Sequence, residues 1–183
     1  MSLNKPATAT TVTHHEENEA LVKVLGFWDK YSKPIIYIGS AIILAIAGYF
    51  IYKTFVKEPK ELKAAETIFP AQKLFDKMAS AGFNKDSVNI LLNGGVLEGQ
   101  PVTGLLKIQN SYSGTQAANL AAYMTGAAYL QIKEFDKAIK YLKEFNGHGA
   151  TQVQSRAYVM LGHAYAEKKN SDEALNYYKK GAP

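Results

Sequence analysis

The sequence of 183 residues contains no cysteine and a single arginine, Arg156. The lack of cysteine excludes disulfide bonds, thiolate metal sites and thiol catalysis. The scarcity of arginine argues against bidentate contacts with phosphates or bases. From Glu58 onward the chain carries about 15 basic and 12 acidic side chains, so its net charge of +5 forms no basic stripe there. We therefore expect no nucleic-acid partner.

Motifs for catalysis and metal binding are also missing. The sequence has no HExxH, no GxSxG and no carboxylate–histidine cluster. No GK[ST] follows Asn93-Gly94-Gly95, which we interpret as a turn. His14 and His15 lie in a polar tail, His148 in a glycine-containing linker and His163 in a predicted helix. We predict a protein that is not an enzyme and that binds neither a cofactor nor a metal.

The beginning of the chain changes character twice. Residues 1–15 are mostly small and polar and predict a disordered tail. In residues 16–33 apolar side chains recur at helical spacing, which predicts an amphipathic helix beside a membrane. Trp28 and Tyr31 are of the types that favour a water–lipid boundary. Pro34 marks either a break or a bend within one long helix.

Residues 34–56 form the longest apolar run, with no charge between Ile35 and Tyr52. About 20 helical residues cross about 30 Å of hydrocarbon, so the run predicts one transmembrane helix. The alternatives are a buried soluble helix and a cleaved signal peptide, which the long preceding segment disfavours. Lysines flank both ends almost equally and leave the orientation open.

The predicted span carries small residues along one face. Ala41, Ala45 and Gly48 stand at i, i+4 and i+7. Small side chains at such spacing allow a second membrane helix to approach closely. The alternative is that they are ordinary positions of a helix that faces lipid.

Two stretches of the second half of the chain align without gaps at a period of 36 residues. They are NLAAYMTGAAYLQIKEFDKAIKYLKEF from Asn119 and SRAYVMLGHAYAEKKNSDEALNYYKKG from Ser155. Self-similarity at this period predicts stacked helix–turn–helix repeats, at residues 117–146 and 153–181. The pattern resembles the tetratricopeptide repeat (TPR), whose usual period is about 34 residues. The matched positions are Gly126 and Gly162, Tyr129 and Tyr165, Asp136 and Asp172, Ala138 and Ala174, and Tyr141 and Tyr177.

We interpret the matched residues as core. Gly126 and Gly162 allow close approach of two helices, and Ala138 and Ala174 are small where the helices cross. Phe135 is expected to pack under the turn of the first repeat. Serine stands at the corresponding place in the second repeat, which predicts a looser corner.

The segment before these repeats is predicted to form a degenerate hairpin over residues 59–112. Pro70 should kink its first helix, and residues 78–100 are interpreted as a long insertion. The predicted fold is all-α: a single transmembrane helix followed by a short TPR-type array of α-hairpins, an α-solenoid. The TPR domain is predicted to cover residues 57–183 and to contain at most six helices.

In such an array the first helix of each hairpin lines the concave face, which predicts a groove for an extended or helical peptide. The groove is mildly apolar with two polar side chains. Alternatively, some of its residues pack against the neighbouring hairpin. The predicted lining is Leu120, Tyr123, Ala127 and Leu130 from the first repeat, and Arg156, Val159, His163 and Ala166 from the second.

The order of parts, with FWDKYSKP before the span and the TPR hairpins after it, resembles the membrane-anchored TPR proteins of the YfgM type, in forms found in Bacteroidetes. These are ancillary to the SecYEG translocon. The resemblance implies a bacterial inner-membrane protein with a cytoplasmic N-terminus and a periplasmic TPR domain. It also implies SecYEG channel subunits, emerging chains or periplasmic chaperones as partners. Alternatives are a scaffold of another envelope complex, for assembly, secretion or motility, and a cytoplasm-facing TPR receptor.

Overall fold

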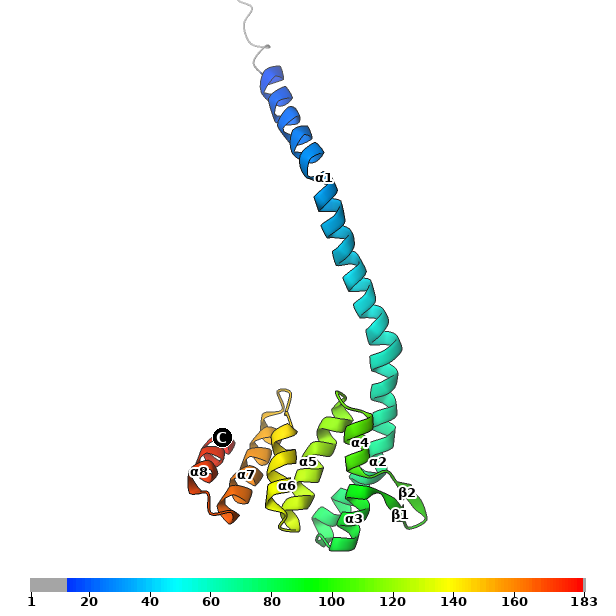
Figure 1. The fold of residues 1–183 in the computed structure, drawn as a ribbon, viewed down its shortest axis with the longest axis vertical. Coiled ribbons are helices and arrows are strands. Elements are labelled where there is room, and N and C mark those ends of the chain that lie inside the picture. Colours follow the sequence, from blue (N-terminus) through cyan, green and yellow to red (C-terminus); the bar gives the residue numbers. More distant parts are fainter. Residues whose placement is uncertain (1–12, 183) are drawn as a thin grey trace, which may run out of the picture. The chain divides into compact units, whose positions relative to one another are not determined.

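A computed structural model describes residues 13–182 of the chain. The chain divides into two compact units, Met1–Lys53 and Thr54–Pro183, which are treated separately below. Figure 1 labels the elements of both. Most of the predicted disordered tail, residues 1–12, lies outside the described residues.

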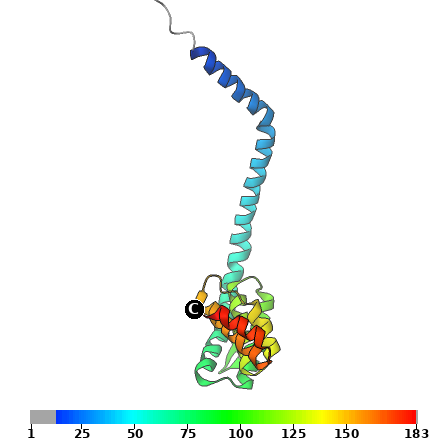
Figure 2. The ribbon, with the colours of Figure 1, turned by 90° about the vertical axis from the view of Figure 1, so that its left-hand side faces the viewer.

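The first unit contains one helix of 40 residues, α1 (Thr13–Tyr52). It begins inside the predicted tail and passes through Pro34 without a break, so the predicted helix at 16–33 and most of the predicted span at 34–56 are one element. Proline lacks one backbone hydrogen bond and its ring crowds the preceding turn. A helix whose other hydrogen bonds remain intact therefore bends at a proline instead of ending there. Figure 2 shows α1 bent along its blue part, the part that contains Pro34.

The apolar part of α1 is uncovered by other elements. Ile43 is 67% exposed, Leu44 72% and Ile51 61%. The helical segment that starts at Lys30 is long and apolar enough to cross a membrane, and none of its most apolar stretch is buried. This surface argues against the alternative of a buried soluble helix, because such a helix hides its apolar faces against a core.

A π-helical turn, η1 (Lys53–Lys57), precedes α2 (Glu58–Ala81) in the sequence. Pro59 lies at the start of α2, directly after this π-helical turn, and Lys57 before it already has helical backbone angles. The helix continues past Pro70 to Ala81 and buries one face, with Ala64, Ile68, Ala71, Leu74 and Met78.

The predicted long insertion at residues 78–100 consists of regular elements, the last of which extends to Val102. It contains the end of α2, then α3 (Lys85–Asn93) and a two-stranded antiparallel hairpin of β1 (Gly95–Leu97) and β2 (Gln100–Val102). The side chain of Asn84 caps α3 by accepting a hydrogen bond from the Ser87 N–H at 2.8 Å. Glu98 and Gly99 join the strands with φ values of 51° and 77°, as a tight hairpin turn requires.

The rest of the second unit consists of α4 (Leu105–Ser111), α5 (Gln116–Gln131), α6 (Phe135–Glu144), α7 (Thr151–Glu167) and α8 (Ser171–Gly181). Residues 54–182 thus hold seven α-helices, α2 to α8, and the prediction of at most six was wrong. The hairpins α5–α6 and α7–α8 pack side by side, and both α2 and α4 pack on α5 (Figure 1). The predicted degenerate hairpin is therefore α2 with α4, separated in sequence by α3 and the β-hairpin.

The core contacts follow the repeat. A Cβ added at Gly126 would lie 2.6 Å from Leu142 Cγ, and one at Gly162 would lie 2.6 Å from Tyr178 Cδ1. Both glycines therefore sit at close helix contacts, as predicted. Ala138 is fully buried and Ala174 is 4% exposed.

The tyrosines of the repeat form stacked pairs. The rings of Tyr129 and Tyr141 lie 5.6 Å apart at 16°, and those of Tyr165 and Tyr177 lie 5.5 Å apart at 7°. Each pair joins the first helix of a hairpin to its second helix. The same side chains at the same offsets therefore make the same contact in both hairpins.

Candidate protein-binding site

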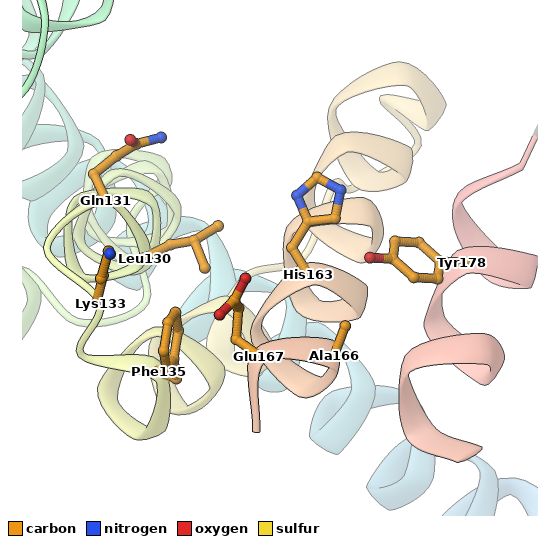
Figure 3. Close-up of a pocket in the computed structure, with 8 residues that line it drawn as sticks. All are labelled: Leu130, Gln131, Lys133, Phe135, His163, Ala166, Glu167 and Tyr178. Carbon is orange, nitrogen blue, oxygen red and sulfur yellow. The ribbon is translucent and has the colours of Figure 1, made fainter. Parts of the chain in front are cut away.

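A cavity of about 510 Å³ lies between the α5–α6 turn and the hairpin α7–α8. It brings together three of the eight predicted groove residues: Leu130, His163 and Ala166. Figure 3 shows the Glu167 side chain pointing from α7 toward Phe135 and Leu130 on the opposite wall. The rest of the lining is Gln131, Lys133 and Tyr178.

The α5–α6 turn places one wall of this cavity. Lys133 adopts a positive φ of 65°, and the Glu134 N–H then donates to the Tyr129 carbonyl oxygen at 2.9 Å. This closes the end of α5 with a single left-handed residue. Lys169 has φ 59° at the equivalent position of the second hairpin, with the Asn170 N–H bonded to the Tyr165 carbonyl oxygen at 2.9 Å.

Tyr178 supports the opposite wall. The rings of His163 and Tyr178 meet edge to face with centroids 5.6 Å apart. The His163 side chain is exposed to solvent but held against α8 by this contact. The cavity therefore offers apolar surface, an imidazole and charges of both signs within one shallow site.

A second cavity, of about 580 Å³, is lined by another residue of the predicted groove, Leu120. It lies between α2, α5 and the α6–α7 linker, and Ala65, Ile68 and Val153 supply apolar lining. The sequence prediction missed the contribution of α2, although Leu120 and the helical spacing of Ala65 and Ile68 are visible in the sequence.

Three hydrogen bonds hold the linker at the edge of this second cavity. The Asn119 amide group donates to the Asn146 carbonyl oxygen at 2.7 Å and accepts from the Asn146 N–H at 2.9 Å. The Gln154 side-chain oxygen accepts from the Gly147 N–H at 2.6 Å. The linker is thus tied to α5 on one side and to α7 on the other.

The remaining predicted groove residues do not form one continuous surface. Ala127 is 7% exposed and is one of the buried apolar residues of α5. Tyr123 is half-buried, with its ring centroid 5.2 Å from that of Phe145. Val159 faces the end of α8, because a Cβ on Gly181 would lie 2.9 Å from its Cγ2. The contacts given for Tyr123 and Val159 lie within their own hairpins, so the alternative of packing against the neighbouring hairpin stays open for them.

Two polar residues of the predicted groove, Tyr123 and Arg156, interact electrostatically. Burial raises the pKa of the Tyr123 phenol, and the positive charge of Arg156 opposes that shift. Arg156 itself is exposed. Within the residues that the structure describes, no three histidine, aspartate or glutamate side chains gather closely enough to hold a metal ion.

The three small residues predicted to line one face of the span are exposed. Ala41, Ala45 and Gly48 are solvent-facing on α1, and a Cβ added at Gly48 would meet nothing within 4 Å. Their role in packing against another membrane helix stays a prediction.

Residues 155–182, which include most of α7 and all of α8, match the tetratricopeptide repeat family. The chain contains a TPR. This confirms the repeat predicted at 153–181, and it supports the function of a protein–protein interaction module, which is the usual role of such repeats. No curated protein and no solved structure matches the chain.

Proposed function

We propose that the chain is a membrane-anchored protein-binding module that presents a short TPR-type array to protein partners. The observation that carries this proposal is the cavity lined by Leu130, His163 and Ala166, which lies beside the matched repeat at residues 155–182. The exposed apolar surface of α1 supports anchoring in a bilayer.

The composition of the cavity suits a peptide. Leu130, Phe135 and Ala166 can contact an apolar side chain, while His163 and Glu167 can bond to polar groups of the same segment. Such a mixed lining is typical of sites that bury a few anchors of a peptide and leave the rest in solvent. The second cavity, around Leu120, would extend this contact surface along α5.

As the identity of the partner we propose the SecYEG channel subunits, with emerging chains or periplasmic chaperones as further partners. The support is the order of parts, a polar N-terminal segment, a span and TPR hairpins, that the chain shares with YfgM-type proteins. On this proposal the N-terminus is cytoplasmic and the hairpins are periplasmic at the bacterial inner membrane.

The test is affinity purification of the full chain from membranes in mild detergent, with partners identified by mass spectrometry. Ala166→Glu places a carboxylate in the cavity, whereas Ala79→Glu makes the same change at an exposed position near the end of α2. We expect the first variant to lose the partner and the second to retain it. Tyr123→Ala is a poorer probe, because it also removes a packing contact with Phe145.

The outcomes separate the two parts of the proposal. Stoichiometric recovery of SecYEG subunits supports the translocon assignment. Recovery of another complex, lost with Ala166→Glu, keeps the binding module and removes the translocon. If no protein is recovered in stoichiometric amount, or if both variants retain the partner equally, the cavity is not the binding site.

A further inference from the structure

A third cavity, of about 280 Å³, lies among α6, α7 and α8 and shares no lining residue with the cavity around Leu130. Two lysines line it, Lys143 from α6 and Lys180 from α8, and no aspartate or glutamate does. Within the part of the chain that the structure describes, neither lysine forms an ion pair. The cavity therefore carries two positive charges without a partner of opposite sign.

Stacked tyrosines hold both ammonium groups at this place. The Lys143 Nζ lies 5.9 Å and the Lys180 Nζ 5.1 Å from the centroid of the Tyr177 ring. The Lys143 Nζ is also 5.3 Å from the Tyr165 ring centroid. Aromatic faces attract cations while leaving most of their N–H donors unused. The tyrosine pair thus positions the charges without neutralising them.

The neutral polar groups of the cavity add further donors. The Asn146 side-chain oxygen accepts from the His148 N–H at 2.8 Å, and the Gln154 oxygen accepts from the Gly147 N–H at 2.6 Å. The side-chain oxygen of each amide accepts one hydrogen bond from a backbone N–H of the linker. The NH₂ group of each amide makes no hydrogen bond within the described residues. Both NH₂ groups, like the lysines, can only donate.

A cavity that presents ammonium and amide donors, but no carboxylate, is complementary to an acceptor that carries negative charge. We propose that this cavity, lined by Lys143, Lys180, Asn146 and Gln154, binds carboxylate side chains of an acidic peptide segment. It is a further contact point, separate from the cavity around Leu130, and it shares Asn146 with the cavity around Leu120. An acidic segment suits it because consecutive carboxylates can meet two ammonium groups held on one tyrosine ring.

The test is fluorescence anisotropy of a labelled oligoglutamate peptide with the full chain in neutral detergent at low ionic strength. The variant Lys143→Ala with Lys180→Ala removes both charges. The matched control, Lys140→Ala with Lys179→Ala, removes two exposed lysines from the same two helices, neither of which lines the cavity. We expect the first variant to raise Kd about tenfold or more and the control to change it about twofold or less.

Other results would overturn the proposal. Equal weakening by the two double variants would mean that the peptide responds to net charge and not to this cavity. Unchanged binding in the Lys143–Lys180 variant would remove the site. Inorganic phosphate serves as a second probe: if it binds through Lys143 and Lys180 while oligoglutamate does not, the ligand class is wrong.

Two further variants keep the result interpretable. Lys180 is exposed near the end of α8, so Lys180→Ala alone is informative if the double variant fails to fold. Ala166→Glu lies in the groove and should leave binding of oligoglutamate nearly unchanged. Loss of binding with Ala166→Glu but not with the lysine variant would place the acidic ligand in the groove, against this proposal.

Discussion

Gly126→Ala tests the central packing contact of the first complete hairpin. In an open helix this change stabilises a protein by about 1 kcal/mol, because alanine loses less backbone entropy than glycine on folding. At Gly126, however, the new Cβ would lie 2.6 Å from Leu142 Cγ, 2.9 Å from Leu142 Cδ2 and 3.0 Å from the Leu142 backbone nitrogen. Leu142 is 1% exposed, so its side chain has no free space to enter.

The expected sign follows from these two effects. Inserting a methyl group into a well-packed core costs about 1–3 kcal/mol. After subtraction of the gain in helix propensity, we expect Gly126→Ala to lower the free energy of unfolding by up to about 2 kcal/mol. Gly162→Ala should cost less, because its clash is with the partly exposed ring of Tyr178, which can move outward.

The assay is urea unfolding of the full chain in mild detergent, followed by far-ultraviolet circular dichroism. Leu142→Ala combined with Gly126→Ala completes a double-mutant cycle. Because the truncated side chain no longer meets the new methyl group, the double variant should be more stable than the sum of the single effects predicts, by about 1 kcal/mol or more. If Gly126→Ala alone stabilises the protein by about 1 kcal/mol, the reasoning from close contact is refuted.

Two further predictions concern buried polar groups. The Thr125 hydroxyl is fully buried and has no hydrogen-bond partner among residues 13–182, so Thr125→Val should raise the free energy of unfolding by about 1 kcal/mol in the same urea assay; a loss of stability would show that the hydroxyl has a partner. Burial raises the pKa values of Tyr123 and Tyr129 above the usual 10.0, so the folded state favours the neutral phenols. Their contribution to stability is complete below about pH 10 and is lost as the pH rises through the raised folded-state pKa values, and unfolding free energies measured against pH should fall less steeply in Tyr123→Phe than in the wild type.

The repeat positions could be predicted because close packing restricts residue type. Only glycine fits at 126 and 162 beside Leu142 and Tyr178, and the recurrence of glycine, tyrosine and alanine at one offset is visible in the sequence alone. Such positions encode contacts between neighbouring helices of one hairpin, which are local in sequence. The second repeat was accordingly found at nearly the same bounds by its family match.

The groove could not be predicted in the same way, because α5 is covered on several sides. It packs against α2, α4, α6 and α7, and most of its residues are buried. An almost continuously apolar helix gives no periodic signal that separates a core face from a binding face. Ala127 therefore looked like a groove residue although it lies in the core.

Residues 78–100 were predicted only as a long insertion, and the elements inside it were not predicted. Asn84, Gly94 and Gly99 serve there as helix caps and as a turn residue between regular elements. At Pro34 the sequence left a break or a bend open, and α1 continues through this residue. Both cases show that capping and bending residues mark changes of direction, which need not be losses of structure.

The tied linker between α6 and α7 has a consequence for the cost of recognition. Because Asn119 and Gln154 fix the backbone of Asn146 and Gly147 from two sides, the extra length of the repeat does not act as a flexible hinge. These hydrogen bonds favour one spacing of the hairpins α5–α6 and α7–α8 before any ligand arrives. When a ligand bridges the two hairpins, the protein loses little conformational entropy, so a small contact area can suffice for selective binding.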